Sequence, residues 1–192
     1  MDCLDAAETT QHNPFHNRNH PREFTSDLVD RGEPIPPMPD RTQPPLNFHD
    51  LAVGDAWTSP ARTVTEADIA HFAGLSGDYN PLHVDAEAAR AGPFGGPVAH
   101  GLLVLSISTG LSAHAPRVDT LAFLEMVSWR FLNPVKPGDT IRVLTAVEAL
   151  EPRSRDRRGV VTWSRRIVNQ AGTVVQEGTT RTLVRGRPTP AN

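Results

Sequence analysis

The order of elements in this sequence predicts an α+β fold, in which an antiparallel β-sheet wraps around one central apolar helix. The first observation is the run GLLVLSISTGL from Gly101, which is apolar on nearly every side, as expected for a helix enclosed by other structure. The second is a series of four strand-like stretches that follows this run. Thirdly, helix signals lie between these stretches and one earlier strand, and no segment is repeated. This order predicts a single α+β domain.

Composition narrows the class of protein. The chain has 192 residues and a formal net charge of −3, which gives no reason to expect binding to nucleic acid or to an anionic membrane. No apolar run approaches the length needed to span a membrane, and the segment MDCLDAAETT lacks the pattern of a signal peptide. A single cysteine, Cys3, excludes an intrachain disulfide. We therefore expect a cytoplasmic protein.

The domain organisation follows from the distribution of proline. Eight of the 18 prolines precede Leu46, and we interpret residues 1–45 as a flexible polar tail. His12, His16 and His20 recur at every fourth position, as on one face of a metal-binding helix, but prolines interrupt the pattern. The sequence predicts one domain over residues 46–186 and a short C-terminal tail over residues 187–192.

The first half of the predicted domain alternates turns and short elements. AWTSPARTV reads as a strand interrupted at Pro60, and Thr65 follows as the N-cap of a helix, with Asp68 completing a capping box. Gly77 ends that helix and Asp85 caps a second one, AEAARA. We expect the central helix to begin after His100 and to end near residue 113.

The second half is predicted to be an antiparallel run of strands. NQAGT and PGD are turn signals between them. The arginine-rich segment RSRDRR is most simply a solvated turn, although guanidinium groups could also contact the phosphates of a nucleotide-containing substrate. The predicted strands are Thr120–Leu132, Thr140–Leu150, Gly159–Asn169 and Thr173–Val184.

The candidate catalytic residues cluster around the start of the central helix. Asp78 and His83 lie in a turn-rich loop, because Asn80 precedes a proline and is biased toward an extended conformation. Gly101 lies in the first turn of the central helix, where free N–H groups and the helix dipole favour negative charge. An acid–base pair facing such a site predicts an active site. A metal site built from Asp78, His83, Asp85 and His100 is an alternative, but it lacks a two-histidine helical spacing.

The two motifs GDYNPLH and GGPVAHGLL resemble the signature of MaoC-like hydratases, the family of R-specific enoyl-CoA hydratases and acyl dehydratases. The resemblance extends from about Phe48 to about Val184 and implies a hot-dog fold. It also implies reversible hydration of an enoyl thioester, with Asp78 and His83 activating water and the Gly101 N–H binding the thioester oxygen. No metal or resident cofactor is implied, because CoA or phosphopantetheine is part of the substrate.

Further site residues and partners follow from the same resemblance. It implies a homodimer, and the substrate is carried by CoA or by an acyl carrier protein. A hot-dog thioesterase and a repurposed dehydratase or binding domain of secondary metabolism remain alternatives. We expect His100 to hold the loop through its ring and two aromatic residues to line the acyl pocket. Thr109 is expected either to bond back to a carbonyl group one turn earlier in its helix or, as the resemblance implies, to orient Asp78. The predicted substrate-binding residues are Asn80, Tyr79, Phe94, His100 and Thr109.

Overall fold

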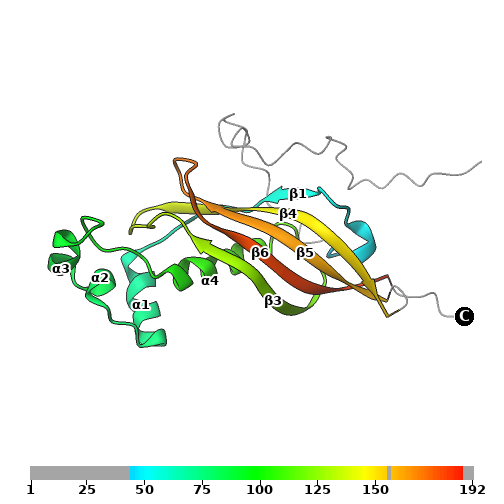
Figure 1. Cartoon of the computed structure of the whole chain (residues 1–192), viewed down its shortest axis with the longest axis horizontal. Helices are drawn as coiled ribbons and strands as arrows, with labels where there is room; N and C mark the ends of the chain where they lie inside the picture. Colours follow the sequence, from blue (N-terminus) through cyan, green and yellow to red (C-terminus); the bar gives the residue numbers. More distant parts are fainter. Residues whose placement is uncertain (1–43, 155–156, 188–192) are drawn as a thin grey trace, which may run out of the picture.

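An antiparallel sheet forms most of the molecule (Figure 1). The computed structural model describes residues 44–154 and 157–187. In the sheet, β1 and β3 are the edge strands, and the order is β1-β4-β5-β6-β3 with β2 paired to β4. The strands are β1 (Ala56–Thr58), β2 (Arg62–Thr63), β3 (Thr120–Phe131), β4 (Thr140–Arg153), β5 (Arg158–Val168) and β6 (Val174–Arg185).

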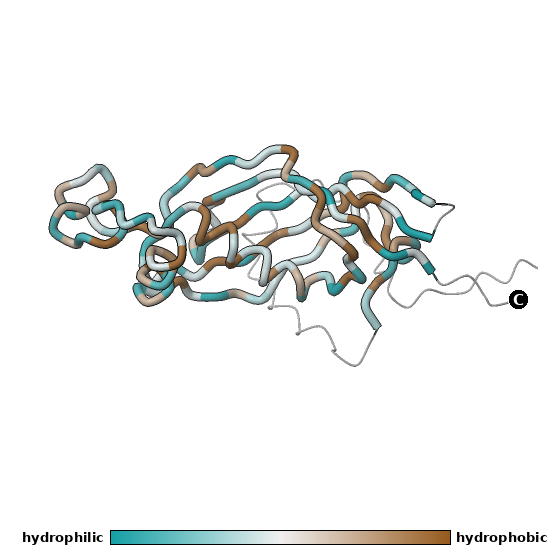
Figure 2. The backbone as a smooth tube through the Cα atoms, turned by 90° about the horizontal axis from the view of Figure 1, so that it is seen from below, coloured by the Kyte–Doolittle hydropathy of each residue, from teal (hydrophilic) through white to brown (hydrophobic). Residues whose placement is uncertain are grey.

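The helices occupy two positions relative to this sheet. Three short helices, α1 (Glu66–Ser76), α2 (Pro81–Val84) and α3 (Ala86–Ala91), gather at one end of the molecule in both views (Figures 1 and 2). The fourth helix, α4 (Gly101–Ser112), packs against one face of the sheet, and a 3₁₀ turn, η2 (Phe48–Asp50), lies near β5. The predicted α+β architecture, a sheet around one central helix, is confirmed.

The main core lies between α4 and the sheet. Leu103, Val104 and Ile107 of α4 are buried against apolar residues of three strands. Full burial of such side chains stabilises the fold by about 1.5–3 kcal/mol each. The strand residues in this cluster are Ile141, Val143, Ile167 and Val175. This packing fixes the position of α4, and therefore the position of its N-terminus.

Most element boundaries agree with the sequence, because periodicity and caps marked them. Thr65 caps α1 and forms the predicted capping box with Asp68, and Asp85 caps α3. The four long strands begin and end within three residues of the predicted positions. One expectation was wrong. His83 does not lie in a loop but on the one-turn helix α2, which Pro81 begins immediately after Asn80.

Three predicted segments fall partly outside the described part of the chain, and one is the C-terminal tail, of which residues 188–192 lie outside it. Of the predicted N-terminal tail, residues 1–43 lie outside it, including Cys3 and the three spaced histidines. The arginine-rich turn joins β4 to β5 at the end of the sheet away from α1–α3 (Figure 1), and its residues 155–156 are also outside. Among the described residues, no helix is long and apolar enough to cross a membrane.

Candidate active site

The loop after α1 fixes the backbone around Asp78. Gly77 ends α1 in the left-handed conformation, with φ of 76°, which glycine adopts without steric cost. The Asp78 N–H then donates to Ser76 Oγ at 3.2 Å, and Asp78 Oδ1 accepts from the Asn80 N–H at 3.2 Å. This Asx-type turn holds the carboxylate at the start of the loop.

The next turn positions the imidazole of His83. Asn80 caps α2 by accepting the Leu82 N–H at 3.0 Å, and Pro81 occupies the first helical position, where its missing donor costs nothing. The Nδ1 atom of His83 lies 2.7 Å from the carbonyl oxygen of Val98. Because a carbonyl oxygen can only accept, Nδ1 carries the hydrogen of the neutral ring. The Nε2 atom therefore keeps a lone pair and can accept a proton.

His100 contacts both the loop of Asp78 and the ring of His83. Its ring is 3% exposed, and Nε2 donates to the carbonyl oxygen of Asp78 at 2.9 Å. The ring also stacks on His83, with centroids 3.7 Å apart, and contacts Phe72 at 5.1 Å. Since its Nε2 is engaged with the backbone of the loop, His100 holds that loop in place.

The three side chains form one cluster. The nearest ligating atoms of Asp78, His83 and His100 all lie within 4.8 Å of one another, and the Asp78 side chain is 53% exposed. A water molecule can bridge two polar atoms at this separation. The arrangement thus combines an accessible carboxylate with an imidazole whose free nitrogen accepts a proton.

The same cluster is poorly arranged as a metal site. Asp85 is not part of it, because its carboxylate caps α3 through the N–H groups of Glu87 and Ala88. The rings of His83 and His100 stack with an interplanar angle of 27°. The lone pairs of stacked rings lie in two nearly parallel planes, here with ring centroids 3.7 Å apart, whereas the ligands of a zinc ion must converge on one point at about 2.0–2.1 Å. The geometry favours acid–base chemistry.

Gly101 opens α4 beside this cluster. Within the described part of the chain, no group accepts a hydrogen bond from the Gly101 N–H, as is usual in a first helical turn. Its carbonyl oxygen accepts from Gln176 Nε2 at 2.9 Å, and Gln176 Oε1 accepts from Trp129 Nε1 at 2.9 Å. A Cβ at Gly101 would lie 2.8 Å from the ring of Phe131, so the close approach of that ring requires glycine.

A pocket of about 610 Å³ opens next to His83 and Gly101. Its lining is mostly apolar, with His83, Asn133 and Gln176 as polar members. A largely apolar pocket with a few convergent polar groups is the usual form of a small-molecule site. The lining residues are Leu82, His83, Phe94, Val98, Ala99, Gly101, Leu102, Val104, Phe131, Leu132, Asn133, Pro134, Val135 and Gln176.

Only some of the predicted substrate-binding residues line the pocket in the structure. Phe94 lines it. Tyr79 does not line it; its side chain is 62% exposed and its hydroxyl lies near Gly74 of α1. Asn80 is engaged in capping α2. The Thr109 hydroxyl donates to the carbonyl oxygen of Ser106, three residues earlier in α4, and does not orient Asp78.

Residues from β3 and β6 were missed by the sequence reasoning. Gln176 is 3% exposed and links Trp129 to Gly101, while Phe131 covers the first turn of α4. The only sequence signal was an amide at a buried position of a strand pattern, and an aromatic residue at the end of another strand. Neither signal indicates which distant element it will meet.

Comparison with known proteins identifies the family. The family model described as "MaoC like domain" matches residues 52–169. Protein MaoC of Klebsiella aerogenes is 39% identical over 62% of this chain, and the match spans 36% of that longer protein. The (R)-specific enoyl-CoA hydratase of Rhodospirillum rubrum is 36% identical over 73% of this chain and 92% of its own length.

Solved structures of similar proteins support the same family and fold. The MaoC-like dehydratase from Rhodospirillum rubrum superposes with a TM-score of 0.67 and 37% identity, covering 75% of this chain and 99% of that one. A protein of Mycobacterium tuberculosis with a double hotdog fold has a TM-score of 0.69 at 23% identity, covering 77% of this chain and 46% of that one. The predicted hot-dog fold is therefore confirmed. The chain belongs to the MaoC-like domain family.

Proposed function

We propose that this protein is a hydro-lyase that catalyses reversible hydration of a 2-enoyl thioester to a 3-hydroxyacyl thioester, of R configuration. Relatives named (R)-specific enoyl-CoA hydratase and 3-hydroxybutyryl-CoA dehydratase support this reaction. The observation that carries the proposal is the juxtaposition of the His83 and Asp78 side chains, within 4.8 Å, next to an apolar pocket lined by Gly101.

In the proposed mechanism, Asp78 and His83 hold one water molecule between them. As the water oxygen attacks C3 of the enoyl group, the pair takes up one of its protons, and the electron pair of the double bond moves toward the thioester. The pair then returns a proton to C2, so that H and OH add to the same face. General acid–base catalysis of this kind contributes about 10²–10⁴ in rate.

The developing negative charge requires a separate acceptor. In the transition state, charge accumulates on the thioester oxygen, and we assign its stabilisation to the Gly101 N–H at the start of α4. The N-terminal end of the helix dipole reinforces this donor. Loss of one such donor costs roughly 3 kcal/mol of transition-state stabilisation. Because Gln176 and Trp129 hold the carbonyl of the same residue, the donor is fixed before substrate arrives.

The substrate supplies its own carrier group. The acyl chain occupies the apolar pocket, and CoA or the phosphopantetheine of an acyl carrier protein remains outside it. The addition of water changes no net oxidation state, so the mechanism needs no resident redox cofactor. His100 serves as a positioning residue, because its contacts are with the loop backbone and with the His83 ring.

A homodimer is part of the proposal. β3 is an edge strand, and an unpaired edge is a ready template for association. Large apolar residues are exposed along this strand, and an apolar edge of this kind fits a second copy of the chain, since two-fold dimers are the commonest oligomers. The exposed residues are Leu121, Phe123, Leu124, Met126, Val127 and Phe131.

The proposal is tested by following the absorbance of the enoyl thioester when purified protein is added. Substrates should include short and medium enoyl-CoA thioesters and the same acyl groups on a carrier protein, with a thiol reagent in a parallel sample. We expect loss of the conjugated double bond without release of thiol. Thiol release with the double bond intact would instead identify a thioesterase, and the hydratase proposal would be abandoned.

A further inference from the structure

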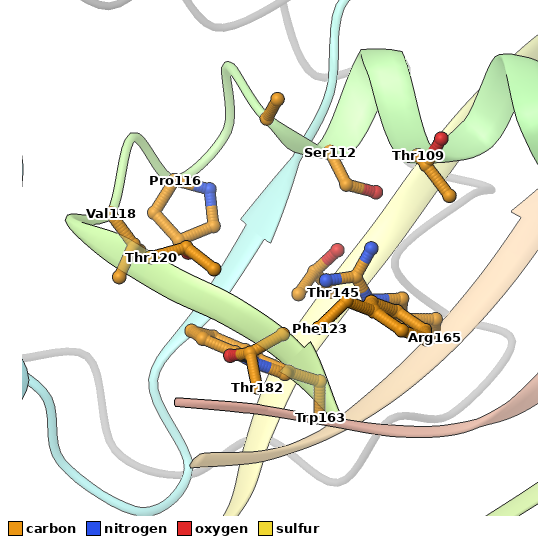
Figure 3. Close-up of a pocket in the computed structure, with 11 residues that line it drawn as sticks. Thr109, Ser112, Pro116, Val118, Thr120, Phe123, Thr145, Trp163, Arg165 and Thr182 are labelled. Carbon is orange, nitrogen blue, oxygen red and sulfur yellow. Dashed lines mark hydrogen bonds between the residues drawn. The ribbon is translucent and has the colours of Figure 1, made fainter. Parts of the chain in front are cut away.

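Arg165 is an unusual residue for the inner face of the sheet. It lies on β5 between Trp163 and Ile167, whose side chains are 2% and 0% exposed and belong to the core. By strand alternation it shares their face, which is covered by α4. Figure 3 shows its guanidinium group beside Thr145, on the side of the sheet that faces Ser112 and Thr109. A positive charge is therefore placed where the neighbouring strand positions are apolar.

This guanidinium has no partner within the described part of the chain. It forms no ion pair or hydrogen bond there, and its Nε atom is fully buried. Burial lowers the pKa of Arg165 to about 10, so the group remains charged at neutral pH. The residue as a whole is half-buried, and a largely desolvated charge without a protein partner is costly and calls for an explanation.

Buried hydroxyls without partners surround the same space. Ser112, Thr145 and Thr180 are at most 6% exposed, and their hydroxyl groups find no hydrogen-bond partner among the described residues. Two hollows of about 220 and 250 Å³ adjoin Arg165, the first lined by Ser112 and Thr145 and the second by Thr180. Together these groups provide a set of donors with nothing to donate to.

The two hollows share Thr109, Phe123 and Arg165, and they follow the catalytic pocket along α4 and β3. One face of α4 contributes to all three cavities. Leu102 lines the pocket of Gly101, Ser106 lines the hollow of about 250 Å³, and Thr109 lines both hollows. Ala113, the residue after α4, lines the hollow of about 220 Å³. The opposite wall is β3, which runs the other way. Five of its residues follow the same sequence of cavities, from the catalytic pocket to the hollow at the far end: Phe131, Trp129, Met126, Phe123 and Thr120. Phe131, Met126 and Phe123 are about half exposed in the single chain, so this wall is open to the proposed second subunit.

We propose that Arg165 binds a carboxylate at the distal end of the substrate's acyl chain, so that the substrate is the thioester of a dicarboxylic acid. The inference rests on the proposed function, in which the thioester oxygen is held at Gly101. From there the acyl chain runs along the exposed face of α4, and its far end meets the guanidinium. Arginine binds a carboxylate through two parallel hydrogen bonds, and the neighbouring hydroxyls can donate to its remaining lone pairs.

The test measures binding without chemistry. The eight-residue step from Gly101 to Thr109 spans about 12 Å of helix, which matches an extended chain of about ten carbons. Decanedioyl-CoA and decanoyl-CoA are saturated and differ only in the terminal carboxylate, and shorter and longer matched pairs cover other chain lengths. Calorimetric titration of the full-length protein should show tighter binding of the carboxylated member for at least one pair. Arg165→Met should weaken the binding of the carboxylated member by about 10- to 100-fold, the effect of losing charged hydrogen bonds. The affinity for the methyl-terminated member should be unchanged.

Arg166→Met is the matched control. Arg166 is the next residue on β5, faces the other side of the sheet and lies 3.9 Å from Glu177. Its replacement removes the same charge and should leave both affinities unchanged. Equal binding of the two members at every length, or equal loss in both variants, would overturn the proposal. Loss of the homodimer in Arg165→Met would overturn it as well, because the guanidinium would then serve the subunit interface.

Hydration is measured separately on the matched unsaturated thioesters. If wild-type protein binds the carboxylated thioesters through Arg165 but hydrates none of the compounds, the carboxylate site stands and the proposed reaction falls. If it hydrates the methyl-terminated substrates and shows no preference for a carboxylate, the reaction stands and the role of Arg165 falls.

Discussion

At the scale of single residues, the carbonyl group of Val98 decides what His83 can do. It accepts the hydrogen on Nδ1 and leaves the lone pair on Nε2 available. Asp78 has a different constraint, because one carboxylate oxygen already accepts from the Asn80 N–H, and the other lies 3.9 Å from His100 Nε2. The loop therefore orients Asp78, and the contact of α2 with Val98 orients His83, before substrate binds, as acid–base catalysis requires.

Asp78→Asn should abolish most of the hydratase activity while the fold survives. We expect kcat to fall by about 10²–10⁴-fold, because the amide cannot take a proton from water. The amide oxygen can still accept from the Asn80 N–H, so the thermal unfolding midpoint should change little. Steady-state kinetics and thermal unfolding of the same preparation check both statements.

Asp85→Asn is the control for this variant. Asp85 lies in the same region of the chain but caps α3, and asparagine caps helices equally well. Its activity should remain at the wild-type level. Full activity in Asp78→Asn, or an equal loss in both variants, would remove the proton-transfer role from Asp78.

The sequence anticipated the residues that lie close together along the chain. Asp78, His83 and Gly101 stand in turn and helix-start motifs whose geometry is local, and the structure places two of them at one pocket and the third within a few ångströms of His83. Gln176 and Arg165 were missed because strand pairing brings them to α4 from far along the chain. Tyr79 was misplaced since its loop position left the direction of the ring open.

At the scale of elements, Gln176 joins the sheet to the N-terminus of α4. Gln176→Met keeps similar volume but leaves Trp129 Nε1 without its partner and removes the side-chain bond to the Gly101 carbonyl, which then keeps only its bond within the helix. We expect the free energy of unfolding to fall by about 1–3 kcal/mol, the cost of unsatisfied buried polar groups. Because the Gly101 N–H is then less firmly held, kcat should fall as well. Urea unfolding and steady-state kinetics measure these two effects.

Gln170→Met is the comparison for that variant. Gln170 is exposed and bonds to Thr140 and Asp139 at the start of β4, where water can replace the lost bonds. Its loss of stability should be clearly smaller, and its kcat unchanged. A Gln176 variant as stable and as active as wild type would show that the contact does not hold α4.

β3 depends on a close approach that only glycine permits. The strand carries three register shifts against β6, so residues three apart, Phe123, Met126 and Trp129, all line the same hollow. In β6, a Cβ at Gly178 would overlap the backbone oxygen of Ser128 and lie 2.5 Å from Cε3 of Trp129. Sequence alternation predicted the strand, but it could not reveal the bulges that turn these side chains inward.

Gly178→Ala should therefore destabilise the protein by about 1–3 kcal/mol, as expected for overpacking. The reference is Gly74→Ala in α1, where the added Cβ would meet only the Tyr79 hydroxyl at 3.6 Å. That change should be neutral or stabilise by up to about 1 kcal/mol, because alanine favours a helix. Equal stabilities in urea unfolding would show that β3 can move away from β6 without cost.

At the scale of the whole molecule, the exposed apolar edge along β3 is the feature that a single chain leaves unexplained. The fold class and the order of the elements could be predicted from the periodicity of the sequence. Which strand forms the unpaired edge of the sheet became known only from the strand order in the structure. We expect a mass in solution near twice 20.9 kDa at low micromolar concentration. Light scattering after size-exclusion chromatography measures it.

Leu124→Lys should shift this mass toward the monomer. The Leu124 side chain is 48% exposed on β3, so lysine is tolerated in the single chain but places a charge in the proposed interface. Val53→Lys is the control, because Val53 is 64% exposed near the other edge strand. A monomeric wild-type protein with full activity would contradict the dimer.

The central claim is that water adds across the double bond of a thioester that stays intact. The direct measurement is mass spectrometry of the products formed from an enoyl-CoA in water labelled with heavy oxygen, with Asp78→Asn in parallel. The account predicts 3-hydroxyacyl-CoA with one labelled oxygen at C3, formed by wild type and almost absent with the variant. Free CoA together with an enoic acid labelled in its carboxylate would contradict it, since the water would have attacked the thioester carbon.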